Sequence, residues 1–212
     1  DGIATEVYKL NSNTDKADVT YPFTATANGV SHSFEVVNGT FKDTEFFHED
    51  DPDPNAAMSI YYRNDGTGFL SKDTGFFTLF KQGSINYTDF TLNEAVENRV
   101  IDIDTENINN TDVWVQTVSA DGTVTTANKW TKVDNTEGNN VIYNSLDKNI
   151  RKIFSVVSRL NDQISIKFAD GNYGDIPRNL IRVWYRTSNG ETYVLRSADV
   201  QDVSVTFPYI GV

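Results

Sequence analysis

The sequence predicts an all-β protein built of two mainly antiparallel β subdomains, of sandwich or open barrel-like form, with few short helices. Nearly every apolar run is short and alternates with polar residues, as in half-buried strands. These runs end at Gly, Asn or Asp, which favour tight turns. Aromatic residues make up 12% of the 212 residues, so large side chains are available for a core without crosslinks.

The first part of the chain reads as a meander of short strands. Alternating runs are found at residues 19–23, 32–37 and 59–63. Pro22 in the first run suits an edge strand, because proline cannot donate a hydrogen bond to a central ladder. Asn28-Gly29 and Asn38-Gly39 favour the positive-φ turns that join adjacent antiparallel strands.

Two further stretches predict a surface loop and a domain boundary. Residues 46–55 contain two prolines and an acidic run, so they predict a loop and not a strand. Residues 75–83 are apolar on both faces, as expected of a strand covered on both sides where two subdomains meet. We therefore expect an N-terminal β subdomain at residues 1–75 and a second β domain at residues 76–212.

The remainder of the chain alternates more regularly. Strands are expected at residues 88–92, 99–103, 113–118, 124–126, 129–133, 153–157, 164–168, 180–185 and 192–195. Asp121-Gly122 and Asn189-Gly190 predict hairpin turns, and residues 93–98 predict a single helical turn or a loop. Trp130 is expected in the core. The spacing of the strands is typical of β-sandwiches and barrels.

Charge and composition exclude several classes of partner. Acidic residues outnumber basic ones by 30 to 18, which gives a formal net charge of −12, and no basic stripe offsets it. Such a surface repels phosphate backbones and anionic lipid headgroups, so we expect neither nucleic acid nor a membrane as a partner. No apolar stretch is long enough to span a bilayer. The opening Asp1-Gly2-Ile3 leads us to expect a piece of a longer polypeptide.

Residues able to support catalysis are few. The absence of cysteine excludes thiolate metal sites and cysteine nucleophiles, and the two histidines are His32 and His48. His32 alternates within a strand, where we expect it to face solvent or a neighbouring hydroxyl, and His48 lies in the acidic loop. No nucleophile elbow, phosphate-binding loop, dinucleotide fingerprint or zinc-protease motif is present. We therefore predict no catalytic residue.

Acidic clusters raise two further possibilities. Asp102 and Asp104 share one strand face and could form a glycosidase pair, although solvated outward positions are the simpler interpretation. Glu49–Asp53 and Asp170–Asp175 offer clustered oxygen ligands for calcium. The second cluster lacks the glycine and glutamate spacing of an EF-hand loop, so it predicts a glycine-dependent hairpin turn. We assign no metal and no cofactor, and calcium binding by Glu49–Asp53 stays open.

One segment carries a family resemblance. Residues 162–177 read Asp-Gln-Ile-Ser-Ile-Lys-Phe-Ala-Asp-Gly-Asn-Tyr-Gly-Asp-Ile-Pro, followed by Ile181–Arg186 and by the turn Asn189-Gly190. This order of strand, Asp-Gly turn, aromatic-Gly turn and strand ending in Tyr-Arg resembles the phage baseplate J-like family, to which the inner-ring wedge subunit of T-even phages is related. Ala169 stands where that family has its first glycine. The resemblance covers about residues 76–196.

The resemblance implies a non-catalytic structural component of a contractile tail baseplate, present in several copies in a ring of wedges. Its partners would be other baseplate proteins and further copies of itself, docking on strand edges and loops. Its location would be the virion, after assembly in the bacterial host cytoplasm. Phe168 would lie inside, and Gly171 and Gly174 would adopt backbone conformations closed to other residues. Helical parts used for ring contacts would lie outside this chain, and residues 1–75 carry no such resemblance.

Two other functions stay open from the residues alone. A carbohydrate-binding or adhesin module, for example on a tail fibre, could stack sugars on Trp114, Trp130 and Trp184 if these are exposed. A glycosidase or other hydrolase would need a cleft with two close, buried carboxylates. The exposure of the tryptophans separates these functions. Buried tryptophans favour a structural scaffold, whereas a coplanar exposed row of them favours sugar binding.

Overall fold

The computed structural model describes residues 21–27, 29–42, 46–52, 61–63, 75–119, 128–137, 150–190, 196 and 198. These ranges consist of strands and their connections, with a 3-10 turn at Leu160–Asp162 (η2), so the predicted all-β fold is confirmed. No helix in this part of the chain has the length and hydropathy needed to cross a membrane. The features expected at residues 121–126 and 192–195 lie outside the described ranges.

The chain divides into two compact units. Unit 1 comprises Asp1–Ser84 and Glu191–Val212, and unit 2 comprises Ile85–Gly190. The division falls after β7 (Leu79–Gln82) and not at residue 75, because β7 pairs with β2 (Val30–Val37) of unit 1. Unit 1 is therefore discontinuous in sequence, and unit 2 is inserted between its two segments.

Unit 1 contains a three-stranded antiparallel sheet and two hairpins. The sheet has the order β1-β2-β7, with β1 at Tyr21–Ala27; the hairpins pair β3 (Gly39–Lys42) with β4 (Phe46–Glu49) and β5 (Tyr61–Arg63) with β6 (Gly75–Phe77). The loop expected at residues 46–55 is therefore wrong for residues 46–49. These residues pair with β3, and the prolines that would interrupt a ladder begin only at Pro52.

One face of the three-stranded sheet is aromatic. Phe23 and Phe34 stack with ring centroids 5.5 Å apart, and Phe80 meets both rings edge-on. His32 lies on the same face of β2 as Phe34, because side chains two apart along a strand point the same way. His32 is 4% exposed, so the expectation that it faces solvent is wrong.

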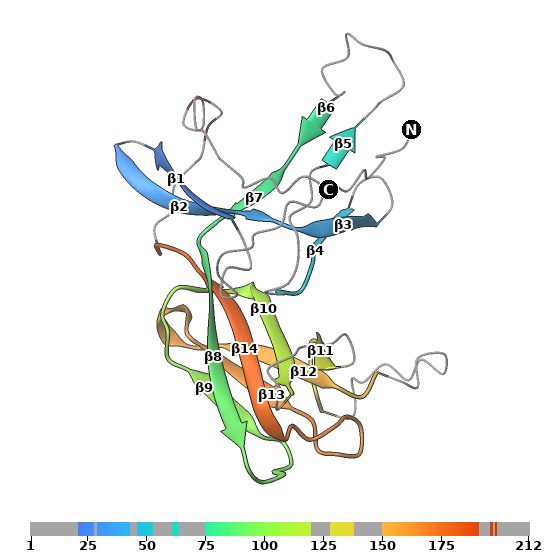
Figure 1. Ribbon diagram of the computed structural model, residues 1–212. Coiled ribbons are helices and arrows are strands. Elements are labelled where there is room, and N and C mark those ends of the chain that lie inside the picture. Colours follow the sequence, from blue (N-terminus) through green and yellow to red (C-terminus); the bar gives the residue numbers. More distant parts are fainter. Residues whose placement is uncertain are drawn as a thin grey trace. The chain divides into compact units, whose positions relative to one another are not determined.

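Unit 2 is a seven-stranded, nearly closed, barrel-like sheet (Figure 1). Its strands are β8 (Ser84–Leu92), β9 (Val100–Ile103), β10 (Ile108–Val118), β11 (Lys129–Lys132), β12 (Ile153–Ser158), β13 (Ile164–Phe168) and β14 (Asn179–Thr187). They follow the order β8-β14-β10-β11-β12-β13-β9. β11 and β12 pair in parallel, whereas β10 with β14, β10 with β11, β12 with β13 and β13 with β9 are antiparallel. β8 and β9 are thus the two ends of the sheet.

Alternating side chains fill the interior of unit 2. The buried core residues are Leu92, Ile101, Ile103, Ile108, Val113, Val115, Trp130, Phe154, Ile164, Ile166, Phe168, Ile181, Val183 and Tyr185. Trp130 meets Phe168 edge-on at 5.1 Å between centroids, and its Nε1 donates to Thr117 Oγ1 at 2.9 Å. The predicted core position of Trp130 is therefore confirmed. The Tyr185 hydroxyl hydrogen-bonds to Thr88 of β8 and to Thr105 after β9, which links the two ends of the sheet through side chains.

Candidate functional site

Polar and aromatic side chains gather on the outer face of β10 and β14. From Val113 onward in β10, and along β14, the core residues are odd-numbered and point into the barrel, so the even-numbered residues there point outward. Four outward side chains are nevertheless buried, each 3% exposed or less: Asp112, Gln116, Trp184 and Arg186. We name these four residues the outer-face cluster. Burial on both faces gives β10 and β14 the character of central strands.

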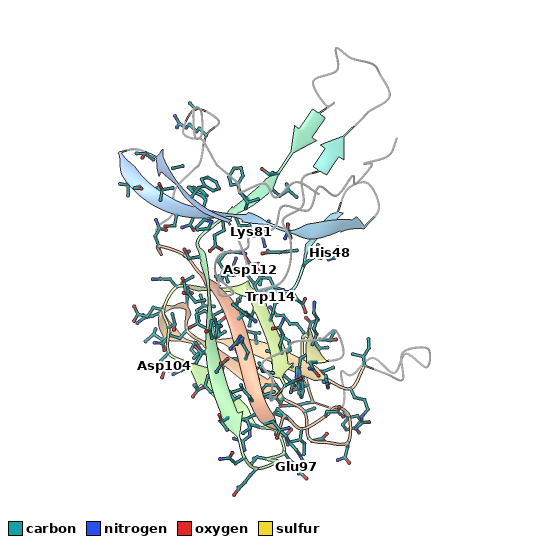
Figure 2. The ribbon with its side chains drawn as sticks, in the orientation of Figure 1. His48, Lys81, Glu97, Asp104, Asp112 and Trp114 are labelled. Carbon is teal, nitrogen blue, oxygen red and sulfur yellow. The ribbon has the colours of Figure 1, made fainter. Side chains whose placement is uncertain are left out.

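A buried ion pair lies within the outer-face cluster. A guanidinium nitrogen of Arg186 donates to Asp112 Oδ2 at 2.6 Å, and the two side chains are 1% and 5% exposed. The Arg186 guanidinium also lies 6.0 Å from the ring centroid of Trp114, which follows Asp112 along β10 (Figure 2). The Asp112 carboxylate is thus the counter-ion of a buried guanidinium.

A bulge in β10 precedes Asp112. The pairing of β10 with β14 shifts register within residues 108–113, so extra residues of β10 loop out of the ladder. Asn110 anchors this bulge, because its side-chain nitrogen donates to Ser158 Oγ at 2.9 Å and its backbone carbonyl accepts a hydrogen bond from Lys132 Nζ. Burial lowers the pKa of Lys132, and the Asp112 carboxylate opposes that effect. Asp112 follows this hydrogen-bonded bulge directly and pairs with Arg186 from there.

The three tryptophans do not form an exposed row. Trp184 is 1% exposed and its Nε1 donates to Gln116 Oε1 at 2.8 Å, while Trp130 is 7% exposed inside the barrel. Trp114 is half-buried. Each indole NH of the two buried tryptophans has an acceptor within the sheet, as buried indoles require. Trp130 and Trp184 are therefore not accessible to stack on a sugar ring, and Trp114 is accessible only in part.

A stacked arginine occupies the outer face of β14 beside β8. Arg182 forms a bidentate ion pair with Asp89, at 2.7 and 2.8 Å, and its guanidinium lies 4.1 Å from the ring centroid of Tyr87 and 5.5 Å from that of Trp184. The hydrogen bond that Arg182 donates to Asp89 is the main cause that raises the pKa of Arg182. Asp89 and Arg182 therefore form a neutral pair on the surface.

Asp102 and Asp104 lie on the outside of unit 2, where their side chains are 55% and 76% exposed. Arg159 bridges them, at 2.7 Å from Asp104 and 3.9 Å from Asp102, and Ser165 donates a further hydrogen bond to Asp102 at 2.6 Å. The hydrogen bond to Asp104 raises the pKa of Arg159. Both carboxylates are solvated and paired, which is unlike the close, buried couple that glycoside hydrolysis uses.

The Asp170–Asp175 segment is a hydrogen-bonded turn. Asp170 Oδ1 accepts from the backbone nitrogens of Asn172 and Tyr173, at 2.9 and 3.1 Å. Arg151, two residues before β12, binds both ends of the turn. It donates to Asp175 Oδ1 at 2.9 Å and to the Gly171 carbonyl at 3.0 Å. The Asp170 carboxylate and Asp175 Oδ1 thus accept hydrogen bonds from donors of the chain itself.

The two glycines of this turn are required for different reasons. Gly171 has a φ of 91°, as expected for a position closed to most residues. Gly174 has no such φ, and the expectation of a special conformation there is wrong. It is instead packed so closely that an added Cβ would lie 2.6 Å from Ile153 Cγ1. Phe168, just before the turn, is 1% exposed, as the resemblance implies.

The Asp170→Asn variant is expected to have a lower free energy of unfolding than the wild type at neutral pH. That free energy should also fall less than in the wild type as the pH is lowered. The backbone N–H of Tyr173, followed by that of Asn172, lowers the pKa of Asp170 below the ordinary 3.8. Its contribution is therefore complete above pH 3.8 and is lost as the pH falls through the lower folded-state pKa. Urea unfolding of both proteins across acidic pH measures this, and parallel loss of stability in the two would contradict it.

The described residues of the acidic loop pair with other parts of the chain. Glu49 pairs with Lys81, the Asp50 nitrogen donates to the Asn38 carbonyl at 2.9 Å, and Asp53 lies outside the described residues. His48 is exposed on β4 (Figure 2). Within the described ranges, no group of three or more His, Asp or Glu side chains is placed to hold a metal ion.

Comparison with known proteins places the chain in a family. A family described as a domain of unknown function, DUF8360, matches residues 1–212. The chain belongs to this family. The comparison with curated proteins gave no match, and neither did the comparison with solved structures. Because the match spans the whole chain, the DUF8360 domain includes unit 1 together with the inserted unit 2.

Sequence reasoning missed the outer-face cluster of this DUF8360 domain. One signal was available, since Arg182 and Arg186 interrupt a strand that is otherwise apolar and alternate with its core residues. Charged residues in a central strand need partners. The partner Asp112 could not be identified from sequence, because the β10 bulge sets its position.

Proposed function

We propose that this chain is a non-catalytic structural component of a contractile phage tail baseplate, acting as a wedge ring subunit through protein-protein assembly. One observation carries the non-catalytic part. Four carboxylates of unit 2 form ion pairs with arginines: Asp89 with Arg182, Asp104 with Arg159, Asp112 with Arg186 and Asp175 with Arg151. Carboxylates used in this way fix strands and loops and are not poised for proton transfer.

The baseplate part of the proposal rests on the resemblance at residues 162–186. The geometry of this segment is architectural, as a scaffold role requires. Phe168 packs in the core, Gly171 turns the chain and Gly174 permits close packing. Partners would be other baseplate proteins and further copies of the chain, in a virion assembled in the bacterial host cytoplasm. The net charge of −12 supports a protein partner over nucleic acid or an anionic membrane.

A carbohydrate-binding or adhesin module is the alternative. It has less support, because Trp130 and Trp184 are buried and Trp114 is half-buried. An array of bacterial surface glycans probed with the purified chain separates the two functions. A structural subunit gives no specific binding, whereas saturable binding to one glycan class favours the adhesin.

Sedimentation of the native chain tests the assembly role. A lysate in which the chain and contractile tails are made together would be fractionated on a density gradient, and the chain followed by immunoblot. A baseplate component co-sediments with tail particles and stays with them through a second gradient. A chain that remains entirely in slow fractions while tails are assembled would contradict the proposed function.

A further inference from the structure

One apolar side chain of unit 2 lies almost entirely in solvent. Leu160 is 83% exposed, whereas every other large apolar side chain in the described part of the chain is exposed by 50% or less. It begins η2, the turn between β12 and β13. Val157, three residues earlier on β12, is a second exposed apolar side chain at this end of the strand. Exposure alone does not mark a binding site, so the way the turn is held is what matters.

Hydrogen bonds fix the backbone on both sides of Leu160. Within the turn the Arg159 nitrogen donates to the Gln163 carbonyl at 2.7 Å, and the Gln163 nitrogen donates to the Leu160 carbonyl at 3.3 Å. From the segment after β9, the Asn107 nitrogen donates to the Asn161 carbonyl at 3.1 Å. The backbone at Leu160 is therefore already ordered, so burying its side chain in a partner costs little further conformational entropy.

The backbone turns sharply directly after Leu160. Asn161 and Asp162 have φ values of 58° and 54°, a left-handed conformation that Asn and Asp adopt more readily than other residues with a Cβ. The side chain of Asn161 secures this turn, because its Nδ2 donates to Glu106 Oε1 at 3.0 Å. Contacts with the rest of unit 2 thus hold the conformation in which Leu160 is exposed.

The surface around this turn is negatively charged. The exposed acidic side chains of the turn and of the adjoining end of β9 are Asp102, Asp104, Glu106 and Asp162. Arg159 pairs with Asp104, which is labelled in Figure 2, and offsets one of these charges. An apolar side chain within an acidic surface is complementary to an apolar pocket that has Lys or Arg at its rim.

We propose that Leu160 inserts into an apolar pocket with a basic rim on a different protein, a neighbour of this chain in its assembly. We name this the Leu160 contact. A second copy of the chain is a poor occupant, because each copy has a net charge of −12 with no basic stripe to offset it. The Leu160 contact deepens the assembly role and rests on the proposed function, since it states the chemistry of the partner surface.

Site-specific photo-crosslinking tests the Leu160 contact. The full chain with benzoylphenylalanine at position 160 would be made together with contractile tails and irradiated, and the cross-linked peptides identified by mass spectrometry. We expect one dominant product with a different protein, joined at a segment where apolar residues lie next to Lys or Arg. Position 96 is the control, because Val96 is 43% exposed and lies in the loop before β9, whereas Asp104 follows β9.

Three results of the cross-linking would overturn the Leu160 contact. They are the absence of a product from position 160, a product with a second copy of the chain, and the same product from positions 96 and 160. A partner segment without Lys or Arg would equally contradict the basic rim.

Substitutions separate the apolar part of the contact from the charged part. Leu160→Gln should lower the amount of chain recovered with tails about tenfold or more, whereas the matched control Val96→Gln should leave it unchanged. Asp162→Asn, which suits the left-handed backbone, should lower recovery roughly threefold at low ionic strength and little at high salt, because salt screens exposed charges. Circular dichroism and urea unfolding show whether each variant is folded. Equal recovery of Leu160→Gln and Val96→Gln would remove Leu160 from the interface, and wild-type recovery of Asp162→Asn at every salt concentration would exclude the basic rim.

The Leu160 contact and the proposed function are tested separately. A wild-type chain that co-sediments with tails, although position 160 gives no cross-link, removes the contact and leaves the assembly role. A cross-link from position 160 to a basic, apolar segment of a protein absent from tails, with the chain in slow fractions, removes the baseplate proposal and leaves the contact.

Discussion

The Asp112→Ala variant is expected to have a free energy of unfolding lower than that of the wild type by roughly 3–5 kcal/mol. Arg186 contacts this carboxylate at 2.6 Å, and both side chains are buried. Removing the carboxylate leaves a buried positive charge without its counter-ion, which costs more than the intact pair contributes. Urea denaturation followed by tryptophan fluorescence measures the change, because Trp184 lies in the same cluster.

Two matched variants separate charge from packing at this pair. Arg159→Met removes the exposed ion pair with Asp104 and should change stability little, since exposed pairs are screened by water. The double variant Asp112→Leu/Arg186→Met replaces the buried pair by apolar side chains and should recover most of the loss. If Asp112→Ala were as stable as Arg159→Met, the buried pair would not be a principal support of β10 and β14.

The Gly174→Ala variant is expected to be destabilised by about 3 kcal/mol. A Cβ here would lie 2.6 Å from Ile153 Cγ1, 2.8 Å from Ala169 Cβ and 2.9 Å from the Arg151 carbonyl oxygen. Two of these atoms belong to backbone or to a Cβ, which cannot move without displacing the chain. The turn after Phe168 must therefore shift away from β12, and thermal or urea unfolding reports the cost.

The second glycine of the turn provides the control. Gly171→Ala should cost about 1 kcal/mol, because the strain comes from its φ of 91° and the nearest atom, Ile176 Cδ1 at 3.1 Å, is a movable side-chain end. Gly171→Asn should be tolerated better, since asparagine adopts positive φ more readily. At position 174, asparagine should destabilise the protein at least as much as alanine, because the obstacle there is close packing and not the backbone φ. A Gly174→Ala protein as stable as the wild type would show that the turn is not closely packed.

Much of the fold follows from the period of the sequence. The strands β12, β13 and β14 lie within a residue or two of the expected runs, because their apolar positions alternate cleanly. β10 begins five residues before the expected Val113, since the polar run of its bulge hides the strand. Strand β4 was missed for a related reason, as the prolines near it made the whole of residues 46–55 look irregular.

The ion pairs could not be predicted, because each joins strands far apart in the chain. Asp89 meets Arg182 only after β8 and β14 become neighbours, and Asp112 meets Arg186 only with the bulge in place. Sequence shows which residues are charged but gives no register between distant strands. His32 was expected to face solvent or a neighbouring hydroxyl, but it lies two residues before Phe34 and therefore shares the buried face of β2.

Immunogold electron microscopy of intact tailed particles tests the assembly role most directly. Antibody raised against unit 2, residues 85–190, would be applied to particles before and after contraction. A wedge subunit gives gold at the baseplate end of the tail, in several copies per particle. Gold confined to fibre tips, or particles that carry no gold although the chain is present in the same cells, would contradict a structural role in the baseplate.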